Sequence, residues 1–232
     1  MFFHPMFDPM YFLFIAPAFL LGLWAQFRIH TAYAQAQQLA APLSGAAAAR
    51  HILDSAGLND VEIEEIPGQL SDHYDPRENV LRLSQAVYEN RTLAAVGIAA
   101  HEAGHAIQHA QAYAPMLVRN AAVPAAGIGS NIGMLLIIIG AILNANPILI
   151  YLGIGLFSCV VFFQLVNLPV EFNASSRAKA QLVGLGIINQ EELGYVNKVL
   201  NAAALTYVAA TLQAVLTLLY FLMRFGGGRS RD

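Results

Sequence analysis

Three histidines at four-residue spacing stand in the segment "AAHEAGHAIQHA", residues 99–110. In an α-helix, residues i and i+4 lie one turn apart on the same face, so His101 and His105 present two imidazoles to one point. Zinc binds imidazole nitrogens at about 2.0–2.1 Å, and this spacing suits it. Glu102 is offset by about 100° around the helix, from where it can reach a zinc-bound water. The residues therefore form an H-E-x-x-H pattern, in which the glutamate is the general base of a hydrolase.

The alternative is a histidine-rich helix whose imidazoles are interfacial, or buried with partners inside the protein. Charged groups beside an alanine-rich surface are costly unless something is bound, which favours the metal. His109 lies about 12 Å along the axis from His101, so in a straight helix it cannot share one ion with both other histidines. We expect a polar or substrate-side role for it, and the H-x-x-G-x-x-H continuation of metzincins is absent.

A catalytic zinc takes three protein ligands and keeps one position open, so the third ligand must come from elsewhere in the chain. Glu171 is the best candidate, because it ends a charge-free stretch of 51 residues and an acidic residue that emerges from a membrane marks a functional site. The charge-free stretch fits two transmembrane helices between His105 and Glu171, and an even number of spans returns the chain to the same side of the membrane. Glu171 could instead complement the dipole of a helix start. The other possible ligands are Glu191, Glu192, His73 and Glu89.

The composition predicts a membrane protein. Hydrophobic residues make up 57% of the chain and charged residues 12%, about half the usual charged share. Charge-free runs cover residues 10–27, 120–170 and 199–223, and a helical span needs about 20 apolar residues. The first and last runs fit one span each, and the middle run fits two spans with a turn at 144–147. The net charge of −3 gives no indication of a nucleic-acid partner.

The polar segment after the first predicted span must position the histidine helix. Ser44 is a plausible N-cap for a helix that Gly57 ends. Residues 61–66 and 79–84 alternate as strands do, and the loop-rich connection between them could close a long hairpin. A short helix and then a long one through 92–112 follow. Further along, Pro169 suits the first turn of a helix, which Gly184 or Gly186 would end.

Three blocks of the sequence resemble a known family: "DHYDPRENVLRLS", "AAVGIAAHEAGHAIQHAQAYAPMLVR" and "LPVEFNASSRA". They are similar to the signature blocks of the YugP-like neutral zinc metallopeptidases, a bacterial membrane family. The likeness extends from the helix near Ser44 to the last predicted span. It implies a membrane-bound zinc metallopeptidase of the gluzincin type, with one zinc ion per chain, and it implies no particular substrate.

A more distant resemblance concerns the third ligand. Glu171 with Ala174 and Ser175 resembles the E-x-x-A-D helix of HtpX-like membrane proteases, in which the glutamate binds zinc and the aspartate supports a ligand histidine. Ser175 stands where that aspartate would be, and a serine cannot supply the carboxylate that usually orients a ligating imidazole. Asn173 or Asp72 could take its place.

Together these observations predict a mainly α integral membrane protein with about four transmembrane helices and a zincin-like α+β soluble insert between the first and the second. The predicted segments are an N-terminal transmembrane segment at 1–27, a metallopeptidase insert carrying H-E-x-x-H at 28–130, a transmembrane hairpin at 131–167, a helical segment carrying the third ligand at 168–200, a C-terminal transmembrane helix at 201–223, and a basic tail at 224–232.

The predicted chemistry is hydrolysis of peptide bonds by a zinc-activated water, with His101, His105 and Glu171 as ligands. Glu102 would take the proton of that water and deliver it to the leaving amine. A second donor to the oxyanion is usual, and the possible donors are His73, Tyr74, Tyr113, Arg177 and His109. We expect a protein or peptide substrate that is membrane-associated. An extended substrate could pair with a strand edge near 61–66 or 79–84.

The basic residues predict an orientation. Of the 12 lysines and arginines, nine lie on the predicted zinc side and three, Arg224, Arg229 and Arg231, lie in the tail. This asymmetry favours a cytoplasmic zinc site in a multi-pass protein of the bacterial plasma membrane, with an extracytoplasmic N-terminus.

Three other functions compete with a peptidase. A non-proteolytic zinc-binding membrane protein, acting as an assembly or chaperone factor, would need the ligands but not Glu102. A di-iron oxidase would spread histidine clusters over several segments, whereas His4, His30, His51 and His73 stand alone. A transporter would carry ionisable residues within its spans to mark a pathway, and the charge-free runs contain none.

Overall fold

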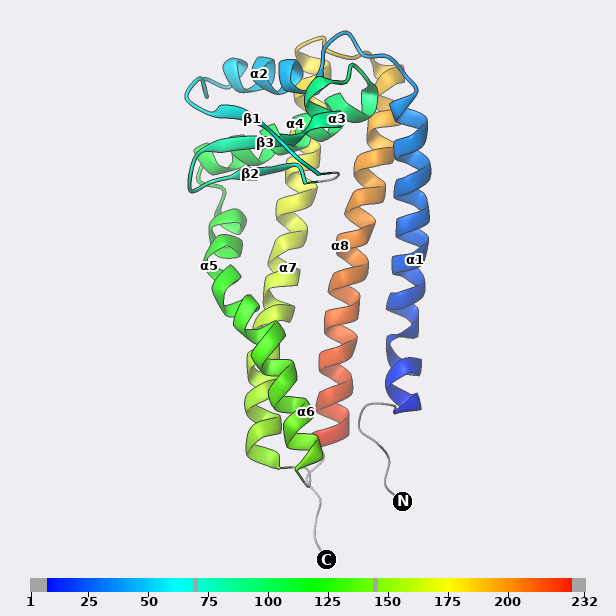
Figure 1. Ribbon diagram of the computed structural model, residues 1–232, viewed down its shortest axis with the longest axis vertical. Helices are drawn as coiled ribbons and strands as arrows, with labels where there is room; N and C mark the ends of the chain where they lie inside the picture. Colours follow the sequence, from blue (N-terminus) through cyan, green and yellow to red (C-terminus); the bar gives the residue numbers. More distant parts are fainter. Residues whose placement is uncertain (1–7, 69–70, 144–145, 227–232) are drawn as a thin grey trace, which may run out of the picture. The chain divides into compact units, whose positions relative to one another are not determined.

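The computed structural model describes residues 8–68, 71–143 and 146–226, and it is mainly helical with one small sheet. Figure 1 shows the elements. In chain order they are α1 (Pro9–Gln37), α2 (Gly45–Ser55), β1 (Glu62–Ile66), β2 (His73–Asp75), β3 (Val80–Ser84), α3 (Gln85–Glu89), α4 (Leu93–Ala110), α5 (Ala114–Ile128), the π-helical turn η1 (Gly129–Gly133), α6 (Met134–Ile142), α7 (Pro147–Gly184) and α8 (Gln190–Phe225).

Within the described residues, four helical stretches are long and apolar enough to cross a membrane, as the charge-free runs predict. They are Pro9–Gln37, Ala114–Ile142, Pro147–Gly184 and Gln190–Phe225. The chain forms two compact units. The helical unit comprises Met1–Trp24, Val118–Leu168 and Thr206–Asp232, and the α+β unit comprises Ala25–Leu117 and Pro169–Leu205. The predicted segment boundaries, which were drawn from charge and hydropathy, stay predictions.

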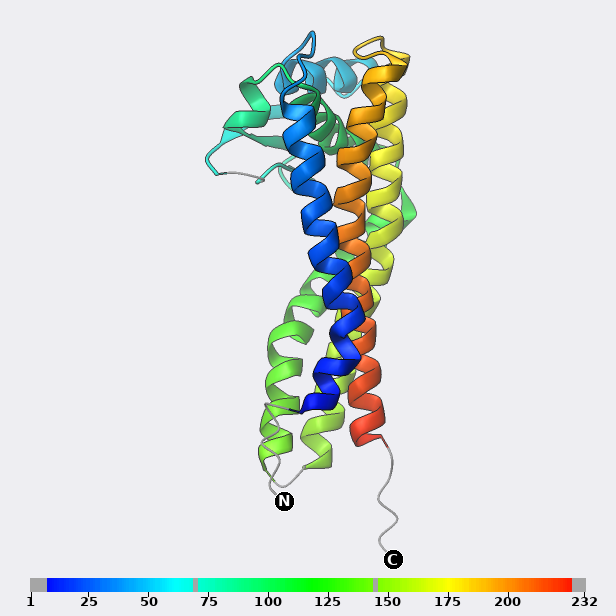
Figure 2. The ribbon, with the colours of Figure 1, turned by 90° about the vertical axis from the view of Figure 1, so that its right-hand side faces the viewer.

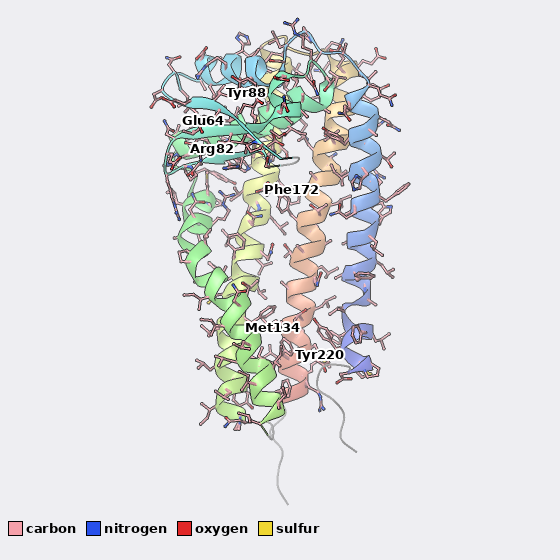
Figure 3. The ribbon with its side chains drawn as sticks, viewed as in Figure 1. Glu64, Arg82, Tyr88, Met134, Phe172 and Tyr220 are labelled. Atoms are coloured by element: carbon pink, nitrogen blue, oxygen red, sulfur yellow. The ribbon has the colours of Figure 1, made fainter. Side chains whose placement is uncertain are left out.

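Within the helical unit, α6 lies beside the first half of α7 in both ribbon views (Figures 1 and 2). Glycines allow a close approach directly before α6, because a Cβ built on Gly153 of α7 would lie 2.6 Å from the backbone oxygen of Gly133, the last residue of η1. Ile137 of α6 and Ile150 of α7 are buried in one cluster with Phe221 of α8. Met134 and Tyr220, labelled in Figure 3, pack against this cluster.

The α+β unit has its own core, in which α2 packs against α4 and α3. Ile52 and Leu53 of α2 and Leu81 and Leu83 of β3 are fully buried. The ends of α2 are as predicted: the Ser44 hydroxyl accepts the N–H of Ala47 at 3.3 Å, and the chain leaves the helix through a Gly57 with φ of +74°. The predicted short and long helices are confirmed as α3 and α4.

The predicted long hairpin between 61–66 and 79–84 is wrong. Strands β1 and β3 pair in parallel, and a short strand that alternation did not reveal, β2, pairs antiparallel with β3. The strand order is β1-β3-β2. The reversal occurs instead in the tight connection from β2 to β3, where Asn79 takes a φ of +58°, a conformation that asparagine tolerates better than most residues.

Charge pairing holds the small sheet across its strands. Arg82 of β3 pairs with Glu64 of β1 at 2.9 Å and with Asp75 of β2 at 3.2 Å, and Glu78 is its third partner. Figure 3 shows Glu64 and Arg82 side by side on the strands. The hydrogen bonds that Arg82 donates to the carboxylates of Glu78 and Glu64 raise the pKa of Arg82 above its ordinary value.

The predicted helix start at Pro169 is also wrong, because α7 continues through Pro169 from Pro147 to Gly184. A proline removes one backbone hydrogen bond but does not end a helix that its apolar surroundings hold together. The helix ends at Gly184, one of the two predicted stops. Of the predicted turn at 144–147, residues 144 and 145 lie outside the described residues, and the Asn146 side chain caps α7 by accepting the N–H of Ile148 at 3.1 Å. Arg229 and Arg231 of the tail also lie outside them.

Candidate metal centre

Helix α4 carries the histidine pair on one face. Its start is capped by the Thr92 hydroxyl, which accepts the N–H of Ala95 at 3.2 Å. The rings of His101 and His105 lie 4.8 Å apart between centroids and are nearly perpendicular. His105 is buried and His101 is partly buried. The four-residue spacing therefore places both imidazoles at one point, as helix geometry requires.

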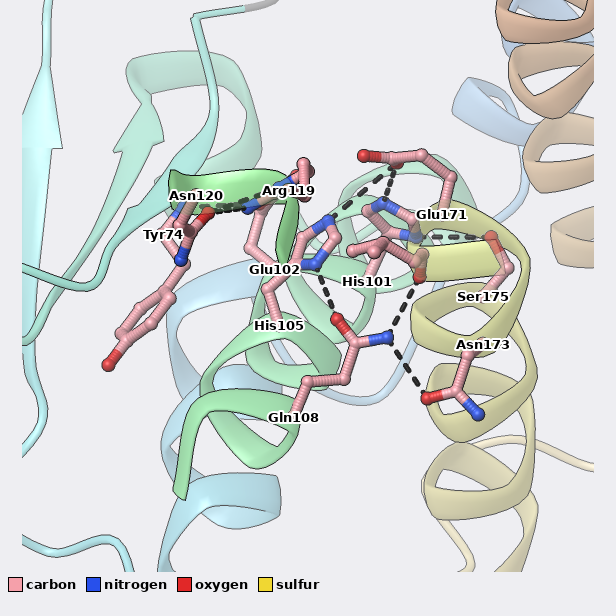
Figure 4. Close-up of polar contacts among 11 residues, drawn as sticks. Tyr74, His101, Glu102, His105, Gln108, Arg119, Asn120, Glu171, Asn173 and Ser175 are labelled. Carbon is pink, nitrogen blue, oxygen red and sulfur yellow. Dashed lines mark hydrogen bonds and ion pairs between the residues drawn. The ribbon is translucent and has the colours of Figure 1, made fainter. Parts of the chain in front are cut away.

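A close contact between α4 and α7 brings the predicted third ligand to this point. A Cβ built on Gly104 would lie 2.7 Å from the backbone oxygen of Ala174, so only a glycine allows the two helices to approach this closely. Glu171 lies on α7 one turn before Ala174. Its Oε2 atom is 3.2 Å from Nε2 of His101 and 3.7 Å from Nε2 of His105 (Figure 4).

The three side chains fit a zinc ion by their donor chemistry. Each of His101, His105 and Glu171 offers one ligand atom, and these atoms lie within 4.8 Å of one another. Both imidazoles direct Nε2 towards the same carboxylate oxygen. Two imidazole nitrogens and one carboxylate oxygen are a ligand set of catalytic zinc sites, which leave a fourth position open.

The other possible third ligands lie elsewhere in the described residues. The group that could hold a metal contains Glu171 and none of Glu89, Glu191, Glu192 or His73. Glu192 instead accepts the N–H of Asn189 at 2.8 Å near the start of α8. The Nδ1 atom of His73 lies 2.7 Å from the backbone oxygen of Ser71.

Glu102 follows the first histidine and is buried. Its Oε2 atom accepts the backbone N–H of Tyr74, on strand β2, at 3.2 Å. Burial raises the pKa of Glu102 to about 7, partly opposed by the charge of His101. A carboxyl group with a pKa near neutrality is suited to accept and return a proton at neutral pH. The contact with Tyr74 was not predicted, because it depends on where the short strand lies.

Both histidines have a partner at Nδ1. Ser175 Oγ lies 3.1 Å from Nδ1 of His101, so the serine that stands at the aspartate position of the E-x-x-A-D pattern does contact a histidine. Nδ1 of His105 is 2.9 Å from Oε1 of Gln108. Sequence reasoning missed Gln108, although its place three residues after His105 on one helix puts the two side chains within reach.

The hydrogen bonds given for the two residues predicted as substitutes for that aspartate go to residues other than the ligand histidines. Asp72 accepts the backbone N–H of Ser84 at 2.8 Å and the Ser84 hydroxyl at 2.9 Å. Asn173 accepts a hydrogen bond from Gln108 at 3.0 Å, and Gln108 in turn contacts His105.

The predicted oxyanion donors are engaged with protein partners. The Tyr74 hydroxyl lies 2.7 Å from Asn79 Oδ1 and 2.8 Å from Nδ1 of His109, and burial raises the pKa of Tyr74 to about 12. Arg177 donates to Asn173, and its guanidinium lies 6.0 Å from the Tyr113 ring centre. A role of any of these residues, or of His73, towards a substrate stays a prediction.

Comparisons with known proteins point to a family of zinc peptidases. Residues 11–226 match the model of a family described as "Putative neutral zinc metallopeptidase". The chain is also similar to a Bacillus subtilis (strain 168) protein named "Putative membrane protease YugP", with 46% identity over 226 residues that cover 96% of this chain and 100% of the relative. No solved structure matches the chain. The match over most of its length shows that the chain belongs to the YugP-like family of neutral zinc metallopeptidases.

Proposed function

We propose that this protein is a membrane-bound zinc metalloendopeptidase, in which His101, His105 and Glu171 hold one Zn²⁺ and Glu102 is the general base. The observation that carries the proposal is that these three ligand atoms lie within 4.8 Å of one another. The buried Glu102 directly follows the ligand His101 on α4. A structural zinc site would require the ligands alone. The neighbouring carboxyl group is what hydrolysis requires in addition.

The roles of the residues follow from their contacts. When bound, zinc lowers the pKa of a water molecule and polarises the carbonyl of the scissile peptide bond. Glu102, held by the N–H of Tyr74, accepts the proton of the attacking water and passes it to the leaving amine. The pKa of Glu102, which burial raises to about 7, suits both transfers.

The proposal extends to location and substrate. The segment 28–130 would be a zincin-like soluble insert between the first and second spans of a multi-pass protein in the bacterial plasma membrane. The nine basic residues outside the tail favour a cytoplasmic zinc site. The substrate would be a peptide or a membrane-associated protein, because the ligand Glu171 belongs to a helix long and apolar enough to cross the membrane.

The alternative is a zinc-binding assembly or chaperone factor without proteolytic activity. The two functions differ in their need for Glu102, so the test compares the wild type with Glu102→Gln in detergent. Bound zinc and cleavage of unfolded casein are measured for both. Glu89→Gln, the same substitution at an exposed residue of α3, is the matched control.

We expect wild type, Glu102→Gln and Glu89→Gln each to hold about one zinc, and only Glu102→Gln to lose cleavage. Zinc in all three proteins with no cleavage by any of them would favour the assembly or chaperone factor. Cleavage by Glu102→Gln at the wild-type rate would contradict the assignment of the base.

A further inference from the structure

Gln108 is a buried polar residue outside the proposed ligand set. Its side chain has no exposed surface, yet each of its polar atoms has a partner. Oε1 lies 2.9 Å from Nδ1 of His105. Nε2 donates to the backbone oxygen of Val170 at 2.8 Å and to Oδ1 of Asn173 at 3.0 Å. Figure 4 shows the amide between His105 on α4 and Asn173 on α7.

The orientation of this amide is fixed by neighbouring groups that can only accept or only donate a hydrogen bond. The backbone oxygen of Val170 can only accept a hydrogen bond. Arg177 can only donate, and its Nε donates to Oδ1 of Asn173 at 2.7 Å, so that atom is an acceptor as well. Both acceptors require the NH₂ group of Gln108. The carbonyl oxygen of Gln108 must therefore face His105.

This orientation determines where His105 carries its proton. A neutral imidazole has one N–H and one lone pair, on different nitrogens. An amide oxygen opposite Nδ1 requires the proton there, which leaves the lone pair on Nε2. Nε2 is the atom that lies 3.7 Å from Glu171 and that must bind the metal. A proton on Nε2 would block the metal and set two lone pairs against each other at Nδ1.

The other histidine has no such constraint. The partner of His101 at Nδ1 is the Ser175 hydroxyl, at 3.1 Å. A hydroxyl can donate or accept, so it accommodates either tautomer. Of the two histidine partners, only Gln108 dictates the proton position.

We propose that Gln108 is a positioning residue of the metal centre, which holds His105 as the Nδ1–H tautomer and so presents the Nε2 lone pair to zinc. Arg177 fixes Oδ1 of Asn173 as an acceptor, that acceptor fixes the NH₂ group of Gln108, and the carbonyl oxygen of Gln108 then faces Nδ1 of His105. The inference rests on the proposed function, because it gives a role to the Nε2 atom as a zinc ligand. An outer partner of a ligating histidine usually changes metal affinity by about 10–100-fold when it is removed.

Two measurements test the inference. The first is the tautomer of His105 in the metal-free wild type, read from two-bond ¹⁵N–¹H couplings in protein with ¹⁵N-labelled histidine at a pH of about 9, well above the ordinary pKa of an imidazole. The second is zinc affinity, measured by competition with a chelator, for wild type, Gln108→Met and Gln108→Glu. Gln111→Met is the matched control, because it is the same substitution at an exposed glutamine. Gln111 accepts from Arg177 at 2.7 Å and, among the described contacts, has no hydrogen bond to His105.

We expect the Nδ1–H tautomer in the wild type, and zinc binding about 10–100-fold weaker in Gln108→Met. Gln111→Met should bind zinc as the wild type does. Gln108→Glu keeps an acceptor for His105 and should lie between wild type and Gln108→Met. An Nε2–H tautomer in the wild type would overturn the inference even if no variant folds.

The outcomes also separate the inference from the proposed function. Equal zinc affinity in wild type and Gln108→Met would overturn the inference alone, because the ligands would then act without the glutamine. A wild type that binds no zinc would overturn the proposed function and the inference with it.

Discussion

The backbone oxygen of Ala174 on α7 occupies the space that a side chain on Gly104 of α4 would need, since a Cβ there would lie 2.7 Å from it. Gly104 stands between His101 and His105 on α4, and Ala174 follows Glu171 by one turn on α7. The glycine within the H-E-x-x-H segment therefore sets the distance between the two helices that carry the proposed ligands.

Gly104→Ala should accordingly separate α4 from α7. We expect a loss of stability of about 1–3 kcal/mol from overpacking against backbone atoms that cannot rotate away, together with weaker zinc binding. Thermal unfolding and chelator competition measure the two effects. Gly194→Ala on α8, where a Cβ meets nothing within 4 Å, is the control and should be neutral or slightly stabilising. Unchanged zinc affinity in Gly104→Ala would show that the close approach is not needed.

Glu171→Gln tests the third ligand. The amide keeps the size of the side chain and removes the charge. Removing an outer partner of a ligating histidine lowers metal affinity by about 10–100-fold, and we expect the loss of a ligand to lower zinc affinity by more. Isothermal titration of the metal-free protein with zinc gives the affinity. Glu191→Gln changes a rival ligand in the same way and should bind zinc like the wild type. The reverse pattern would assign the third ligand to Glu191.

Tyr74→Phe tests whether the Tyr74 hydroxyl stabilises the fold or binds the substrate. The variant loses the bonds to Asn79 and His109 but keeps the backbone N–H that Glu102 accepts. We expect a loss of stability of about 0.5–1.5 kcal/mol with most of the casein cleavage retained, as measured by thermal unfolding and initial rates. Loss of cleavage at unchanged stability would instead make this hydroxyl an oxyanion donor.

The membrane orientation can be read from cysteine labelling, because Cys159 is the only cysteine of the sequence. In a Cys159→Ser background, Glu65→Cys places a thiol on exposed β1 and Leu143→Cys places one at the exposed end of α6. We expect a membrane-impermeant maleimide to label Leu143→Cys in intact cells, and Glu65→Cys only after lysis. Labelling of Glu65→Cys in intact cells would place the metal centre outside the cytoplasm.

The sequence predicted best those features that depend on helix geometry. The spacing of His101 and His105 and the even number of spans before Glu171 were enough to select three residues that the structure brings together. The four apolar helical stretches followed from the charge-free runs. These patterns extend over many residues, so local irregularities do not obscure them.

Features that depend on tertiary contacts were missed. Alternation revealed β1 and β3 but not their parallel pairing, because three-residue β2 gives no periodic signal. Pro169 suggested a helix start, although the surrounding apolar run continues the helix. The spacing of Gln108 from His105 shows only that the two side chains can meet, since the orientation of the Gln108 amide depends on Val170 and Asn173, which lie more than 60 residues away and meet it only through helix packing.

The most direct test of the metal centre is X-ray absorption at the zinc edge of the purified wild type, with the metal content measured on the same sample. We expect about one zinc per chain, bound only by nitrogen and oxygen atoms, with the multiple-scattering signal of two imidazoles at about 2.0–2.1 Å. Changing His105 to alanine should abolish the bound zinc. A sulfur ligand at about 2.3 Å, which only Cys159 or a methionine could supply, would contradict the proposed ligand set of His101, His105 and Glu171. A wild type without zinc would contradict the metal centre itself.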